Sequence, residues 1–244
     1  MCSVEELRNL TETESAQDLP RIRIFTGPFG TGKTEVAINY ALNLAGGDDR
    51  VTLIDMDVIT PYFRTREMAE PLEKRGVEVV APPEITKYVH LPAISGEIWG
   101  ALQRSNGLTV MDVGGDAQGA KAIGQFKALI EESGYIMYMV VNPYRPFNAT
   151  VERIARALRD MEQNSRLRAG ALVSNPNLIA ETTLEVVDEG HRLVERASQE
   201  LELPIAFLCM EERLLEEGVD EQYAQPILPL TRHFHPPWEE QLSD

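Results

Sequence analysis

The sequence predicts an α/β fold: a three-layer arrangement in which helices cover both faces of one mostly parallel, twisted sheet. Short apolar runs, typical of buried parallel strands, alternate along the chain with longer stretches that have apolar residues at helical spacing. A glycine-rich loop also joins the first such strand to the first such helix. Because strand–helix–strand repeats place parallel strands beside one another through right-handed crossovers, both observations favour a single twisted sheet.

The elements follow one another in a regular order, separated by glycine and proline signals such as Gly46-Gly47, Gly76 and Pro82-Pro83. The strands are expected over residues 21–26, 51–54, 77–81, 108–113, 135–141, 169–173 and 204–209, and the last is followed by a Pro-rich tail. The helices are expected over residues 33–45, 64–75, 95–103, 118–133, 148–161 and 181–200. Residues 1–20 are expected to form a flexible lead-in, and residues 21–244 a single domain.

Composition narrows the classes of function. The 244 residues carry a net charge of −16, which disfavours binding to nucleic acid or to an anionic membrane. The two cysteines, Cys2 and Cys209, form no Cys-x-x-Cys pair, so we expect no zinc or iron–sulfur site within one chain. The N-terminal segment has no signal or transit character, and no apolar run is long enough to span a bilayer. These features predict a cytoplasmic protein.

The glycine-rich loop carries the strongest functional signal. It fits the phosphate-loop pattern G-x-x-x-x-G-K-[ST] and lies between a strand and a helix, as the chemistry requires. Its residues are Gly27, Pro28, Phe29, Gly30, Thr31, Gly32, Lys33 and Thr34, and Glu35 follows in the first helical turn. Such a loop turns backbone amides toward a polyanion, while the lysine reaches the β- and γ-phosphates and the Thr34 hydroxyl binds Mg²⁺. We therefore predict a P-loop nucleoside triphosphatase fold that binds a triphosphate with Mg²⁺.

Carboxylates at the ends of neighbouring strands complete the predicted site. Asp112 closes the strand LTVMD and is the candidate Walker B acid, although a helix-capping or turn role is the alternative. Asp55 and Asp57 follow the strand VTLI, and we predict that one orients the attacking water and the other assists Mg²⁺. Strand alternation leaves open whether both face the site. Asp116 is either a γ-phosphate sensor or an ordinary loop aspartate.

Five segments in order resemble the MinD/ParA/cobyrinate-synthase group of P-loop ATPases. They are GPFGTGKTEVAINYALNLA, VTLIDMDVITPYFR, LTVMDVGGDAQG, YMVVNPYRPFNATVERIARAL and ALVSNPNL, which together span roughly residues 21–210. The resemblance implies that the Walker B strand lies beside the phosphate-loop strand. It also implies Mg²⁺-dependent ATP binding, slow hydrolysis and dimerisation around nucleotide. By the same resemblance, Asp57 activates water and Asn175 contacts the base.

One departure concerns the start of the loop. Many members of that group carry a second lysine there, which reaches across a dimer, whereas this chain has Pro28 and Phe29. Arg64 or Arg66 could supply a substitute charge, or could be an ordinary surface arginine.

Three functions remain open from the sequence. The first is a nucleotide-dependent switch that acts on a protein partner. The second is an ATP-dependent small-molecule kinase or amide-forming ligase, and the third is a binding module with negligible hydrolysis. For the second, residues 84–100 are the candidate acceptor-binding segment, although an ordinary connecting segment is the competing interpretation.

Overall fold

The computed structural model describes residues 20–45, 50–56, 68–81, 96–104, 106–215 and 219–233. Its centre is an eight-stranded sheet with the order β3-β2-β4-β1-β5-β6-β7-β8, and every strand pair is parallel. The strands are β1 Ile22–Thr26, β2 Val51–Asp55, β3 Val77–Val80, β4 Leu108–Asp112, β5 Tyr135–Val141, β6 Ala171–Ser174, β7 Ile205–Glu211 and β8 Ile227–Leu230. The predicted α/β class and parallel sheet are confirmed.

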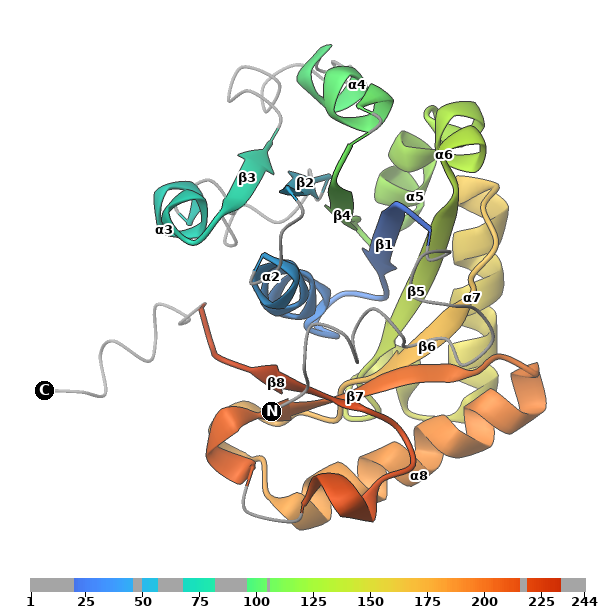
Figure 1. Ribbon diagram of the computed structural model, residues 1–244. Helices are drawn as coiled ribbons and strands as arrows, with labels where there is room; N and C mark the ends of the chain where they lie inside the picture. Colours follow the sequence, from blue (N-terminus) through green and yellow to red (C-terminus); the bar gives the residue numbers. More distant parts are fainter. Residues whose placement is uncertain are drawn as a thin grey trace, which may run out of the picture.

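Helices cover both faces of the sheet, which gives three layers (Figure 1). The α-helices are α2 Lys33–Leu44, α3 Ala69–Lys74, α4 Gly96–Gln103, α5 Ala117–Gly124, α6 Lys127–Ser133, α7 Val151–Ser165 and α8 Leu184–Leu201. Short 3₁₀ turns lie at η2 Pro146–Asn148, η3 Ile179–Glu181, η4 Glu212–Leu214 and η5 Asp220–Gln222. Apolar residues of α2 and α3 share one buried cluster with one face of the sheet, while those of α4 to α8 fill three clusters on the other face.

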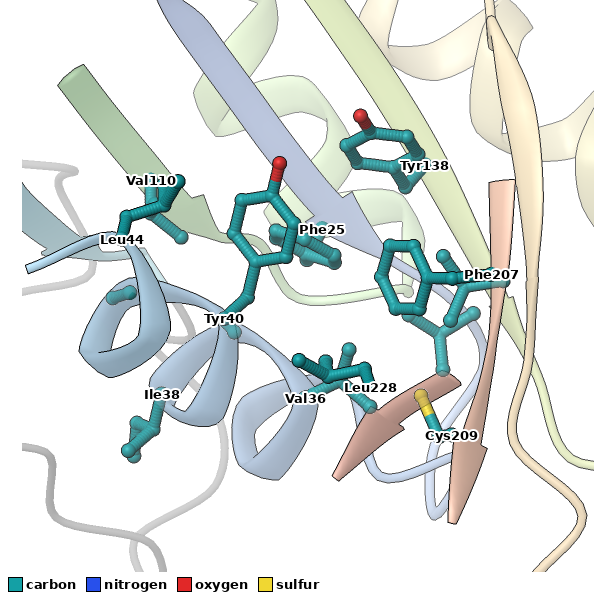
Figure 2. Packing of buried hydrophobic residues seen from close by; sticks show 14 of the residues in the cluster. Phe25, Val36, Ile38, Tyr40, Leu44, Val110, Tyr138, Phe207, Cys209 and Leu228 are labelled. Carbon is teal, nitrogen blue, oxygen red and sulfur yellow. The ribbon is translucent and has the colours of Figure 1, made fainter. Parts of the chain in front are cut away.

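The site-bearing face of the core is built around aromatic rings. Phe25 of β1 packs against Tyr40 of α2 and Tyr138 of β5, with ring centroids 5.0 and 5.1 Å apart, and Phe207 of β7 stacks on Tyr40 (Figure 2). Burial raises the pKa of the Tyr138 hydroxyl well above its usual value, so the ring stays neutral in this apolar layer. This packing fixes α2, and therefore the loop before it, against the central strands.

Two predicted elements differ from the structure. The helix expected over residues 118–133 is divided into α5 and α6, because Phe126 enters the core at the junction and Gly124 lies close to the backbone of α7. The strand ending at Cys209 is not the last. Residues of the Pro-rich tail form β8, which pairs with β7 at the edge of the sheet, where Pro229 is tolerated in a strand.

Within the described residues, no helix combines the length and the apolar character needed to cross a bilayer.

Candidate functional site

The phosphate loop leaves β1 at the carboxyl edge of the sheet and leads directly into α2. Gly32 precedes the helix with φ of 84°, and a Cβ built there would lie 2.6 Å from Nδ2 of Asn175. Glycine is therefore needed both for the left-handed backbone and for the close approach. Because Gly32 carries no side chain, the N-cap residue cannot cap the first-turn amides of α2, and these amides suit an anion.

Two side chains that are far from the loop in the sequence brace it from outside. Asn175, which follows β6 and is 4% exposed, donates from Nδ2 to the Thr31 carbonyl at 2.7 Å. Arg145, in the segment after β5, donates from Nε to the Gly30 carbonyl at 2.9 Å. In a trans peptide the carbonyl and the following N–H point in opposite directions, so the Asn175 contact turns the Gly32 N–H away from Asn175. The braces thus orient loop peptides before any ligand binds.

Inside the loop, Thr31 is fully buried and its hydroxyl donates to the Pro28 carbonyl at 3.0 Å. Lys33 is the first residue of α2 and is 7% exposed, while Thr34 and Glu35 follow in the same turn. One Glu35 carboxylate oxygen accepts from the His233 backbone amide at 2.5 Å. The segment after β8 is therefore bonded to the first turn of the helix that the loop begins.

The two described carboxylates lie side by side. Asp55 of β2 and Asp112 of β4 are register partners on adjacent parallel strands, so their side chains share a face. Leu53 and Val110, two positions earlier, belong to the cluster that α2 covers, which places both carboxylates on the α2 face. Asp112 is 2% exposed. No group of three or more metal-ligating side chains occurs among the described residues. The two carboxylates supply oxygen ligands, which suit a Mg²⁺ ion that takes its other ligands from phosphates and water.

The segment after Asp112 presses against the phosphate loop. A Cβ at Gly115 would lie 1.7 Å from the Gly27 carbonyl oxygen, so only glycine permits this approach. Asp116 then caps α5 and accepts from the amides of Gln118 and Gly119 at 3.0 and 2.7 Å. Of the two interpretations considered for Asp116, the structure supports the local one.

A polar network holds the Asn175 segment in place. Ser174, the last residue of β6, lies 2.9 Å from Nδ1 of the buried His191, whose Nε2 is 3.0 Å from Gln225. Asn177, beyond the end of β6, bonds to residues of the strands on both sides of β6. Its backbone carbonyl accepts from Asn142, just after β5, at 2.9 Å, and its side-chain Nδ2 donates to Glu211 of β7 at 3.0 Å. These contacts connect the ends of β5, β6 and β7 behind the brace.

A cavity of about 840 Å³ opens beside the loop. One wall is formed by the loop and the segment after β4, and the other by η2 and one face of α7. Residues that line it include Phe29, Lys33, Asp116, Phe147, Arg153 and Arg156.

The structure places the loop, Asp55 and Asp112 at one edge of the sheet, and it places Asn175 against the loop, where the resemblance implied a base contact. Asp57, Arg64 and Arg66 lie outside the described residues, as does most of the 84–100 segment. Sequence reasoning missed Arg145, Phe147 and Arg153. For Arg145 and Phe147 the available signal was the run PYRPFN directly after the longest apolar strand, because residues following a parallel strand collect at the ligand-binding edge. Arg153 lies in the helix that follows, where no such signal marks it.

Solved structures with a similar fold carry the same type of parallel sheet. Cell division protein FtsY from Thermotoga maritima is 16% identical with a TM-score of 0.57, covering 85% of this chain and 68% of that chain. FtsY from Mycoplasma mycoides is 15% identical with a TM-score of 0.55, covering 84% and 68%. FlhF complexed with GTP and Mg²⁺ is 14% identical with a TM-score of 0.50, covering 84% and 72%. The fold is that of a P-loop nucleoside triphosphatase.

No protein-family model matches the sequence, and no curated protein matches it.

Proposed function

We propose that this protein binds a nucleoside triphosphate with Mg²⁺ and hydrolyses it slowly as a nucleotide-dependent switch. The observation that carries the proposal is the braced loop of residues 27–34, which faces the Asp55–Asp112 pair from the adjacent strands. The loop amides and the Lys33 ammonium group hold the β- and γ-phosphates. The bound cation would supply charge neutralisation, with the Thr34 hydroxyl and the two carboxylates around it.

The choice of base and of the water-orienting group rests on resemblance. Resemblance to the MinD/ParA group favours ATP, whereas the FlhF structure is a complex with GTP. The same resemblance assigns water activation to Asp57 and favours a homodimer around nucleotide. A switch would pass its state to a protein partner through residues 57–66 and 114–119, which follow the two carboxylate-bearing strands.

A second candidate, a small-molecule kinase or ligase, is favoured by the 840 Å³ cavity beside Lys33. That volume lies within the range of small-molecule sites. The described lining comes from the loop, the segment after β4, η2 and α7.

Turnover with no added acceptor tests the proposal. Phosphate release is measured with ATP and with GTP, with and without Mg²⁺, while light scattering follows oligomeric state. We expect slow, Mg²⁺-dependent release from a switch, and release only after an acceptor is added from a kinase or ligase.

Two variants test the site itself. Lys33→Ala should weaken triphosphate binding by about 100-fold, since a charge-assisted contact to several phosphate oxygens is lost. Asp112→Asn should remove the Mg²⁺ dependence. Lys74→Ala is the matched control, because Lys74 is exposed on α3 and pairs only with Glu70 among the described residues. Equal affinity in Lys33→Ala and Lys74→Ala is the outcome that rejects the proposed function.

A further inference from the structure

The cavity beside the phosphate loop reverses the charge balance of the chain. The protein carries a net charge of −16, yet the cavity is lined by three cationic side chains, Lys33, Arg153 and Arg156, and by two carboxylates, Asp116 and Asp160. Asp116 is already engaged by two amides of α5. The cations of the lining outnumber its carboxylates by one, and one of these carboxylates is already bonded, so the lining attracts an anion although the protein as a whole is acidic.

The cations at the α7 side are partly oriented. The Arg153 guanidinium donates from one terminal nitrogen to the Pro146 carbonyl at 2.6 Å, and its remaining nitrogens make no hydrogen bond with the described residues. Arg156 lies one turn further along α7, with its side chain 81% exposed and 3.9 Å from Asp160. That distance is too long for a strong ion pair. Arg156 can therefore bind a ligand while giving up little of its interaction with Asp160.

Apolar surface accompanies this charge. The large apolar side chains exposed in the described part of the chain are Phe29, Phe147 and Trp99, and the first two line the cavity with exposures of 71% and 63%. The lining also includes small residues, among them Gly114, Ala117 and Ala120. The cavity therefore offers apolar contact and a cationic anchor within one space.

From these observations we propose that the cavity binds a second ligand, a small molecule with a carboxylate and an apolar part, beside the γ-phosphate position. This inference rests on the proposed function, because Lys33 belongs to both sites. A carboxylate carries one charge, and it meets less repulsion from a neighbouring triphosphate than a second phosphoryl group would. The planar guanidinium group of arginine also matches the geometry of a carboxylate, which can accept two parallel hydrogen bonds from it.

The test uses a fluorinated probe, 3-(4-fluorophenyl)propionate, followed by ¹⁹F NMR line broadening on the full chain. The matching alcohol, 3-(4-fluorophenyl)propanol, has the same ring and no charge. A carboxylate is chosen because a phosphate probe would also occupy the phosphate loop. We expect the propionate to bind and the alcohol to bind much more weakly or not at all.

Two variants of α7 locate the binding. Arg156→Gln should weaken propionate binding about fivefold, the size expected for one exposed charged contact. Arg159→Gln is the matched control, since Arg159 is an exposed arginine of the same helix outside the cavity lining, and it should bind as the parent protein does. Binding that is absent in the parent, equal for alcohol and propionate, or equally weakened by both variants overturns the inference.

A parallel titration with a fluorescent triphosphate separates the two proposals. Arg156→Gln should retain Mg²⁺-dependent triphosphate affinity, because Arg156 makes no contact with the phosphate loop among the contacts described. If the parent protein binds the triphosphate but does not broaden the propionate signal, the second ligand alone is rejected. Absence of triphosphate binding in the parent protein rejects the proposed function instead.

Discussion

Replacing Asn175 with alanine separates two roles for this side chain. The structure makes it a brace that donates to the Thr31 carbonyl at 2.7 Å, whereas family resemblance makes it a contact to the nucleotide base. A brace acts on the loop and should affect every ligand with a triphosphate. A base contact should affect only ligands that carry a base. Inorganic tripolyphosphate, which has the phosphates alone, distinguishes the two roles.

The size of the effect follows from burial. Asn175 is 4% exposed and Thr31 is fully buried, so removing the amide leaves a carbonyl with its partner lost. That loss costs about 1–3 kcal/mol. The free loop of the variant relaxes to solvate this carbonyl, and ligand binding then has to restore the braced conformation. Because alanine leaves room for a water molecule, we expect the lower part of this range, roughly 1–2 kcal/mol, which corresponds to about 5- to 30-fold weaker binding.

The loss of affinity is measured by calorimetric titration of the parent protein and of Asn175→Ala with Mg²⁺–tripolyphosphate, Mg²⁺–ATP and Mg²⁺–GTP. All three affinities should fall by similar factors. Asn164→Ala is the control, since among the described residues the Asn164 side-chain amide bonds only within its own helix, to the Asp160 carbonyl at 2.7 Å. If tripolyphosphate affinity is unchanged while ATP or GTP affinity falls, the brace reasoning is refuted and the base contact is supported.

Three further outcomes follow from packing. Gly115→Ala should lower the free energy of unfolding, measured by urea titration, by about 2 kcal/mol, because its Cβ would meet the Gly27 carbonyl. Gly100→Ala should raise the free energy of unfolding by about 0.5–1 kcal/mol, because its Cβ would lie in open space on α4 and alanine favours a helix more than glycine does. Arg23→Met should raise the unfolding free energy by about 1–3 kcal/mol, since Arg23 is 2% exposed with no acidic partner among the described residues; a lower midpoint contradicts this. In a Cys2→Ser background, Cys209 should resist alkylation by iodoacetamide until the protein unfolds, because burial raises the pKa of its thiol. Labelling is followed by mass spectrometry, and rapid labelling of the native protein would contradict the burial of Cys209.

The sequence alone determined what contiguous stretches encode. The phosphate loop could be predicted because its glycines, Lys33 and Thr34 are adjacent in the chain and act through local backbone geometry. The strands could be predicted because continuous apolar runs identify buried parallel strands, and the end of such a run locates Asp112. Parallel topology then brings strand ends to one edge, and this placed Asp55 near Asp112 before their register was known.

Only the tertiary structure decided which distant residues act on the loop. The Asn175 and Arg145 braces join residues that are 144 and 115 positions apart, and no local periodicity encodes such pairs. The strand β8 escaped prediction because its prolines weaken the local strand signal, while its pairing with β7 at the sheet edge tolerates them. The cavity was likewise beyond sequence reasoning. Its charge and its aromatic rim arise where α7 and the loop converge in space, because packing, rather than chain order, sets which side chains share a volume.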